Sequence, residues 1–198
     1  MGANHSISCN HAVAQVIAET LKANGHEVFW HDLHQEGFNP VMPSNELVND
    51  NSEDPLITAH QEEIKVVDGI IIVHPNWWGQ PPVILKGWVD RVLRQEIAYT
   101  FPDNDSGGGL PIGLLKAKVG IVFNTSNTPA QREDAVFSDP LQRIWKDCIF
   151  GFCGVHTFDR RMFRIVADST ALERQLCWRK QKSLSIAIFR AVSGIRAE

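Results

Sequence analysis

A short run of β-branched apolar residues near the middle of the chain limits the possible folds more than any other feature. Residues 66–73 end in four such residues in succession, IIIV. An extended strand with apolar side chains on both faces is typical of a central parallel strand that helices cover on both sides. Residues 118–123 repeat the pattern as KVGIVF. The sequence therefore predicts an α/β fold with a buried parallel sheet.

Helical patterns alternate with these strands. Residues 12–21 carry apolar side chains at the helical period. Pro81 and Pro82 open a second helix at its first turn, and Asp139 as N-cap with Pro140 at the first helical position opens a third. Further elements are expected at 28–30 (extended), 156–166 (the last strand) and 169–192 (a C-terminal helix). This alternation predicts βαβ units and a doubly wound parallel sheet.

Length, charge and cysteine usage narrow the class of protein. The 198 residues suit a single domain, 1–198, and the net charge of −4 gives no basic surface for nucleic acid. The longest strongly apolar run, 69–73, is far shorter than the roughly 20 residues that a membrane span needs. The N-terminus lacks the features of a secretory signal. We therefore expect a cytoplasmic protein whose cysteines are free thiols: Cys9, Cys148, Cys153 and Cys177.

Aromatic and polar residues follow both predicted central strands. Ligands of doubly wound sheets bind at the carboxyl ends of the strands, so these residues are candidates for a binding site. The first group is His74, Pro75, Asn76, Trp77, Trp78 and Gly79, and the second is Asn124, Thr125, Ser126 and Asn127. Two adjacent tryptophans in such a turn suit a flat heteroaromatic ligand, although each could instead cap the core. The second group could hydrogen-bond a ligand ring or form an ordinary turn.

The start of the first helix is the third candidate. Ser6, Ser8 and Asn10 precede it or lie in its first turn. Unpaired backbone N–H groups and the helix dipole favour a phosphate at such a position, although an ordinary N-cap is the simpler interpretation. The expected topology places all three candidates along one edge of the sheet.

The twenty residues from His74 to Leu93, HPNWWGQPPVILKGWVDRVL, closely resemble the signature of the flavodoxin-fold NAD(P)H:quinone oxidoreductases, the DT-diaphorase-like family. Weaker support comes from the segments 8–12, 24–28, 32–33 and 36–40. The likeness covers nearly the whole chain. It implies a five-stranded flavodoxin-like sheet, in strand order 2-1-3-4-5, with helices on both faces.

The resemblance also implies a function. Such a protein is a flavin-dependent NAD(P)H dehydrogenase, usually a homodimer, which reduces quinones or similar acceptors by ping-pong hydride transfer. FMN is the expected cofactor because the chain shows no extra segment for an adenosine, and FAD stays open. Ser8 and Asn10 would hold the phosphate and ribityl end of the flavin. The residues Pro75, Asn76, Trp77, Trp78 and Gly79 would line the ring, and Asn124, Thr125, Ser126 and Asn127 would contact its pyrimidine side.

Three departures from the family pattern bear on these expectations. Residues 1–7 contain no apolar strand or His-Pro turn, so we expect the first strand to be missing or very short, or replaced by a partner segment. The Tyr and His that relay a proton in the mammalian enzymes have no counterpart. The glycine-rich stretch from Gly107 to Gly109, in an expected surface loop, has no assigned role. The main alternative function is a flavin-binding ancillary subunit of a membrane transporter, and an electron-carrier flavodoxin is disfavoured by the mild net charge.

Other titratable residues have competing interpretations. His74 could donate a proton near the flavin or only satisfy a backbone carbonyl. His31 and His34 have an H-x-x-H spacing, but without a Cys or acidic partner at ligand spacing we expect no metal. Cys148 and Cys153 are expected to be a core thiol and a loop thiol rather than a redox pair. Three arginines could attract the pyrophosphate of NAD(P)H or form a solvated or dimer-facing patch: Arg160, Arg161 and Arg164.

Overall fold

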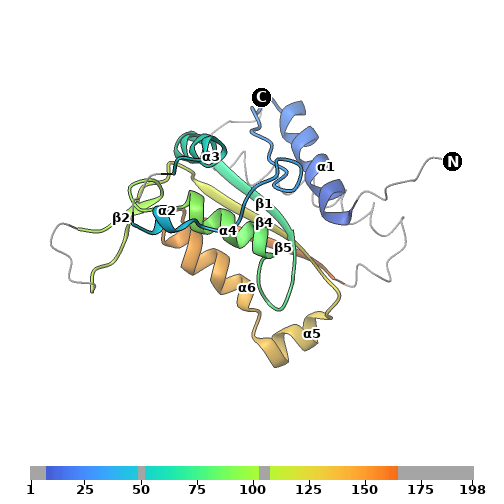
Figure 1. Ribbon diagram of the computed structural model, residues 1–198. Coiled ribbons are helices and arrows are strands. Elements are labelled where there is room, and N and C mark those ends of the chain that lie inside the picture. The colour runs from blue at the N-terminus through green and yellow to red at the C-terminus, as the bar shows by residue number, and fades with distance from the viewer. Residues whose placement is uncertain (1–7, 49–51, 103–107, 165–198) are drawn as a thin grey trace.

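The computed structural model describes residues 8–48, 52–102 and 108–164, and its centre is a parallel sheet (Figure 1). The three strands are β1 (Gly69–Pro75), β4 (Val119–Ser126) and β5 (Thr157–Arg164), with β4 in the middle. Both pairings are parallel, and the register places Ile121 of β4 between Ile71 of β1 and Asp159 of β5. The predicted α/β class with a parallel sheet is confirmed.

Helices surround this sheet. They are α1 (Cys9–Ala23), α2 (Ser44–Val48), α3 (Pro55–Val66), α4 (Val83–Val92), α5 (Ala130–Arg132) and α6 (Pro140–Arg143). The π-helical segments η1 (Glu133–Phe137) and η2 (Ile144–Gly151) continue α5 and α6. The short strands β2 (Tyr99–Thr100) and β3 (Ile112–Gly113) form a separate antiparallel ladder.

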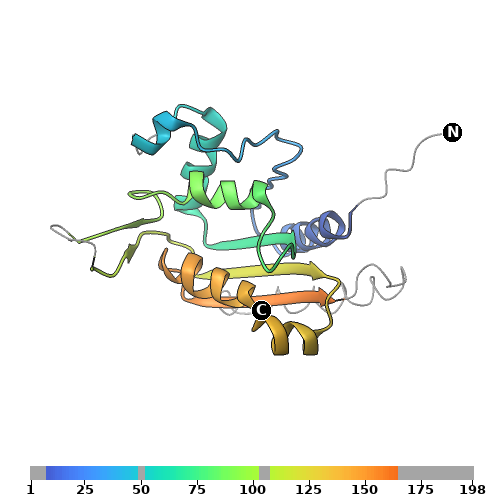
Figure 2. The ribbon, with the colours of Figure 1, turned by 60° about the horizontal axis from the view of Figure 1, so that its bottom comes forward.

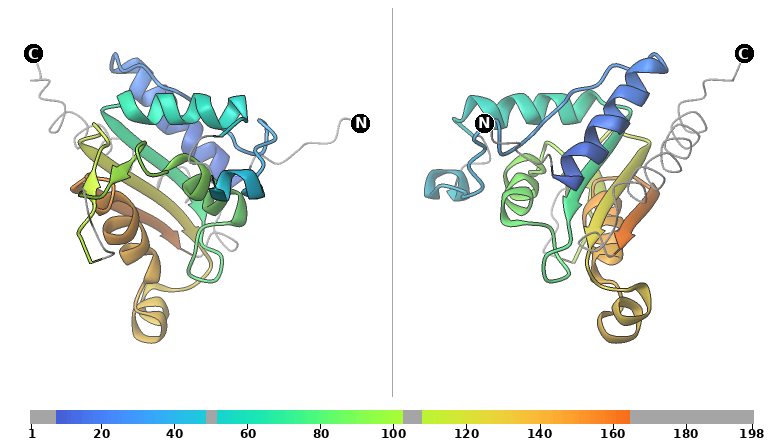
Figure 3. Two further views of the ribbon diagram at one scale, coloured as in Figure 1. Left: turned by 60° about the vertical axis from the view of Figure 1, so that its left-hand side comes forward. Right: turned by 90° about the vertical axis from the view of Figure 1, so that its right-hand side faces the viewer.

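The two faces of the sheet have separate apolar cores. On one face, Val13, Ile17 and Leu21 of α1 pack against β4 side chains that include Ile121 and Phe123. The opposite face is covered by α3, α4, α6 and η2 in a larger core, whose members are Ile57, Ile64, Ile70, Ile72, Leu85, Val92, Val122, Leu141, Trp145 and Phe150, among others. Figure 3 shows the sheet between these helices. The alternation of side chains along β1 and β4 explains why both strands are apolar on both faces.

Most predicted elements are present, with shifted bounds. The helix over 12–21 is α1, which Asn24 ends as its C-cap. The strand predicted over 66–73 begins only at Gly69, because α3 continues through Val66 and was not anticipated. The segment 28–30 is not assigned as a strand, since no neighbouring strand in the described part of the chain pairs with it.

Asp139 has the expected position but not the expected contact. It precedes Pro140 at the start of α6, yet its side chain makes no capping hydrogen bond. The carboxylate instead pairs with the Arg160 guanidinium from β5. A tertiary ion pair has therefore replaced the local N-cap interaction that the sequence suggested.

A buried ion pair fixes α4 to α2. Arg91 donates from Nε to Glu46 Oε2 at 3.0 Å and from Nη2 to Glu46 Oε1 at 2.6 Å. Its Nη1 also donates to the Asn39 carbonyl at 2.7 Å. The hydrogen bonds from Arg91 hold the pKa of the Glu46 carboxyl below its ordinary value. This pair orients the helix that directly follows the turn at residues 77–80.

The described part of the chain contains three of the four cysteines. Cys9, Cys148 and Cys153 form no disulfide. The expected places of two thiols were wrong: Cys148, expected in the core, is exposed, and Cys153, expected in a loop, is buried. The π-helical turns of η2 depart from the α-helical period on which that expectation relied. Burial raises the pKa of Cys153 to about 11. None of the helices in the described ranges combines the length and apolarity that crossing a bilayer requires. Cys177, the expected helix at 169–192 and the expectation about the first strand in 1–7 lie outside the described residues.

Candidate functional site

The turn that follows β1 presents two indole rings to solvent. Trp77 and Gln80 exchange backbone hydrogen bonds of 3.1 and 3.0 Å, which closes a two-residue turn. Trp78 and Gly79 between them have φ values of 57° and 73°, as a type I′ turn requires. A Cβ on Gly79 would lie 2.7 Å from Pro140 Cγ, so only glycine fits there. Trp77 is 57% exposed and Trp78 is fully exposed. The core-capping alternative therefore does not describe these two side chains.

Asn76 anchors this turn to the rest of the sheet. Its backbone N–H donates to the Thr125 carbonyl at 2.7 Å, and its Oδ1 accepts from the Gly79 N–H at 3.0 Å. Its Nδ2 donates to Oε1 of the buried Glu133 at 3.0 Å. The other Glu133 oxygen has no hydrogen-bond partner among the described residues and lies 3.9 Å from Arg164 Nη1. Three hydrogen-bonding groups of Asn76 thus hold the turn in one conformation.

A chain of buried hydrogen bonds runs from the core to the ends of β1 and β4. His74 Nδ1 donates to the Pro75 carbonyl at 2.7 Å, and its Nε2 accepts from Trp145 Nε1 at 2.9 Å. Asn124 Nδ2 lies 2.7 Å from the same Nε2, and Asn124 Oδ1 accepts from Arg160 Nη1 at 3.1 Å. Burial lowers the pKa of His74 to about 4. His74 is therefore a neutral core residue that satisfies a backbone carbonyl, which was the second of its two interpretations.

The three arginines of β5 are paired with acceptors inside the protein. Arg160 contacts Asp139 and Gln142, and its side chain is only 5% exposed. Burial lowers the pKa of its guanidinium, while Asp139 acts in the opposite direction. Arg161 pairs with Asp159, and Arg164 lies near Glu133. Their charges are thus largely compensated, which weakens the interpretation that they form a free basic patch for pyrophosphate.

The first helix begins at the same end of the sheet. Figure 2 shows the arrowheads of β1, β4 and β5 pointing toward the side of the molecule where α1 starts. Ser8 is the N-cap, and its hydroxyl accepts from the His11 N–H at 3.2 Å. The Asn10 Oδ1 is buried and has no hydrogen-bond partner in the described part of the chain. A buried acceptor without a partner, beside a helix N-terminus, is suited to a polar ligand.

The structure brings most of the predicted site residues together, but some are exposed and others are buried. The β1–β4 register places Pro75 beside Thr125 and His74 beside Asn124. Asn124 is completely buried, and both its amide atoms are used internally, so its side chain positions others. Thr125 and Ser126 are mostly buried, and Asn127 is exposed.

Two parts of the site were not found from the sequence. Glu133 reaches Asn76 across 57 residues, and Trp145 reaches His74 across 71 residues. Neither lies in a motif or at a strand end, so no local pattern indicated it.

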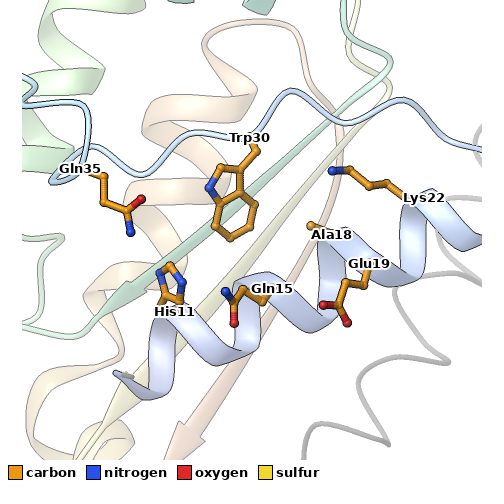
Figure 4. Close-up of a pocket in the computed structure, with 7 residues that line it drawn as sticks. All are labelled: His11, Gln15, Ala18, Glu19, Lys22, Trp30 and Gln35. Carbon is orange, nitrogen blue, oxygen red and sulfur yellow. The ribbon is translucent and has the colours of Figure 1, made fainter. Parts of the chain in front are cut away.

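A hollow lies between α1 and the segment 30–35 (Figure 4). Its volume is about 320 Å³, and its lining is His11, Gln15, Ala18, Glu19, Lys22, Trp30 and Gln35. The rings of His11 and Trp30 meet edge to face at 5.9 Å. The lining is mostly polar, and it shares no residue with the predicted flavin contacts.

The comparisons with known proteins agree with this geometry. The Flavodoxin_2 family, described as a flavodoxin-like fold, matches residues 2–176. The chain belongs to this family.

Two relatives and one solved structure illustrate the likeness. The chain is 34% identical over 162 residues to an uncharacterized NAD(P)H oxidoreductase of Haemophilus influenzae, with 79% of this chain and 76% of the relative covered. It is 33% identical over 176 residues to NAD(P)H dehydrogenase [quinone] 1 of Rattus norvegicus, with 78% of this chain and 63% of the relative covered. An FMN-dependent NADH-azoreductase from Bacillus anthracis, solved in complex with FMN, superposes with a TM-score of 0.70 at 14% identity, with 91% of each chain covered. The last comparison shows the fold alone.

The buried neutral state of His74 predicts a loss of stability in mild acid. The pKa of an unfolded histidine is about 6.5, whereas that of His74 in the fold is about 4. Between these values the unfolded state binds a proton that the folded state does not. The free energy of unfolding should therefore fall by about 1.4 kcal/mol for each pH unit of acidification.

Urea unfolding between pH 7 and pH 4.5 measures this slope. In His74→Gln the dependence should be smaller by about one proton over the same range. Equal slopes in the two proteins would show that His74 does not carry the effect.

Proposed function

We propose that the protein is a flavin-dependent NAD(P)H dehydrogenase that reduces quinones or similar two-electron acceptors. The observation that carries this proposal is the rigid turn after β1, which presents the exposed rings of Trp77 and Trp78 at the carboxyl end of a parallel strand. That is the position at which ligands of such sheets bind. The names of the relatives, an NAD(P)H oxidoreductase and a quinone dehydrogenase, support the same reaction.

The residues around the turn fit a flavin. The N–H groups at the start of α1 and the Ser8 hydroxyl would hold the phosphate. Asn10 Oδ1, which has no partner among the described residues, would accept a hydrogen bond from a ribityl hydroxyl. Pro75, Asn76, Trp77, Trp78 and Gly79 would line the ring. Thr125 and Ser126 at the carboxyl end of β4, and Asn127 directly after it, would contact the pyrimidine side, while the buried Asn124 would only position its neighbours. A bound flavin would supply the hydride chemistry, and the protein would supply binding, orientation and exclusion of water.

The finer points of the proposal concern the cofactor and the reaction order. FMN is the first choice, because the Bacillus anthracis neighbour is named as FMN-dependent. NAD(P)H and the acceptor would occupy the same face of the ring in turn, which is a ping-pong order. A cytoplasmic homodimer is the expected form, and the exposed indoles of Trp77 and Trp78 are available to contact a second subunit.

A single set of spectra tests the function. The purified protein should be yellow, NADH or NADPH should bleach the flavin absorbance, and a quinone should restore it. Initial rates measured at several quinone concentrations should give parallel double-reciprocal lines, as a ping-pong order requires. A protein that takes up neither FMN nor FAD would overturn the proposal. Flavin binding with negligible bleaching would favour the ancillary-subunit alternative.

A further inference from the structure

A compact group of histidine and glutamate side chains joins the segment after α1 to helix α3. His31 and Glu36 come from that segment, and His60 and Glu63 lie about one turn apart on α3. His31 Nδ1 is 2.8 Å from Glu36 Oε1, and His31 Nε2 is 2.5 Å from Glu63 Oε2. His60 Nε2 is 3.3 Å from Glu36 Oε2. We call these four residues the histidine cluster, and none of them belongs to the proposed flavin site.

Two buried polar atoms of the cluster have no hydrogen-bond partner in the part of the chain that the structure describes. They are His60 Nε2 and Glu36 Oε2, which face each other. His60 is only 2% exposed, so its unpaired nitrogen is costly unless something binds it. The His31 side chain is 30% exposed, so the cluster borders solvent. One ligand atom from each of His31, Glu36 and His60 lies within 4.8 Å of the others.

We propose that His31, Glu36 and His60 bind one zinc ion. Two imidazole nitrogens and a carboxylate, with a fourth position for water, form a donor set typical of zinc in proteins. Glu63 completes the arrangement, because a zinc-bound histidine usually gives its other ring N–H to a carboxylate. With His31 Nδ1 on the metal, Nε2–H would donate to Glu63. The ion would link the 31–36 segment to α3.

A hydrogen bond to His60 competes with zinc binding. Trp88 Nε1 donates to His60 Nδ1 at 2.8 Å. An indole nitrogen is a donor only, so the neutral His60 carries its proton on Nε2, the atom that must bind the metal. For Nε2 to bind zinc, the ring hydrogen must move from Nε2 to Nδ1. Nδ1 can then no longer accept a hydrogen bond, so the bond from Trp88 breaks. Removal of the indole N–H should make zinc bind more tightly.

Calorimetric titration of the chelator-treated full chain with Zn²⁺ tests the site. We expect one ion per chain for the wild type and for His34→Ala, which removes an exposed histidine of the same segment outside the cluster. His31→Ala should lose this binding and, because the side chain is partly exposed, should still fold. Glu63→Gln should weaken it about 10- to 100-fold.

The variant Trp88→Phe tests whether His60 is a metal ligand or only a structural residue. Since a typical hydrogen bond contributes about 0.5–1.5 kcal/mol, its removal should tighten zinc binding roughly 2- to 10-fold. Unchanged or weaker binding in Trp88→Phe would overturn the assignment of His60 Nε2. Absence of stoichiometric zinc binding by the wild type, or its persistence in His31→Ala, would overturn the site. These outcomes do not depend on whether the protein binds flavin.

Discussion

Replacement of both Trp77 and Trp78 by alanine is expected to weaken flavin binding by about 10- to 100-fold while leaving the free energy of unfolding nearly unchanged. The two rings are largely exposed, so the folded protein gains little from burying them. Contact with a flat aromatic ring adds about 0.5–1.5 kcal/mol per side chain beyond the buried area. Two such contacts account for a loss of this size.

Fluorescence titration with FMN gives the affinity, and urea unfolding of the flavin-free protein gives the stability. Trp30→Ala is the matched control, because Trp30 is also exposed but lies in the hollow beside α1. It should leave the FMN affinity unchanged. Wild-type affinity in the double variant would contradict the assignment of the turn as the flavin site.

Arg91→Met is expected to lower the free energy of unfolding by about 3–5 kcal/mol. The substitution leaves the Glu46 carboxylate buried without its bidentate partner. Breaking one side of a buried pair costs this much because the remaining charge stays desolvated. Most proteins have a total stability of only about 5–15 kcal/mol, so the effect is large. Urea unfolding at pH 7 measures it.

The double variant with Glu46→Met and Arg91→Met isolates the cause. It should recover most of the loss, since replacing both charges by apolar groups of similar volume is often nearly neutral. Acid provides a second check. The lowered pKa of Glu46 contributes stability above its unfolded value, and that contribution is lost as the pH falls through the folded value. Arg91→Met should therefore lose less stability on acidification than the wild type does. No recovery in the double variant would place the loss in packing instead.

The parts of the fold that depend on local pattern could be predicted. Runs such as IIIV predict buried strands, and prolines such as Pro81 and Pro82 indicate where α4 begins. Helix α3 was missed, although Asp54 as N-cap and Pro55 in its first turn are helix-start signals. The extended segment 28–30 shows the opposite limit, because strand formation needs a paired neighbour and not only β-branched residues.

The candidate site also has parts that follow from local pattern and parts that do not. The position of Trp77 and Trp78 follows from the strand-turn-helix pattern, so the sequence located it. Their exposure could not be predicted, because it depends on the type I′ geometry that Asn76 and Gly79 enforce together. The contacts of Asn124 with His74 and Arg160 come from three different strands. Such contacts arise from strand register rather than spacing along the chain.

The backbone of Trp78 has a consequence for how this protein can evolve. A bulky residue with φ of 57° sits in a region that glycine and asparagine occupy more cheaply, at a cost of order 1–3 kcal/mol. Glycine at this position would relieve the strain but remove a ring from the proposed ligand face. Selection for a more stable fold would therefore favour glycine at this position, whereas selection for the proposed catalysis would favour tryptophan. Variants selected only for thermal stability should therefore lose Trp78 early, and with it one ring of the proposed flavin site.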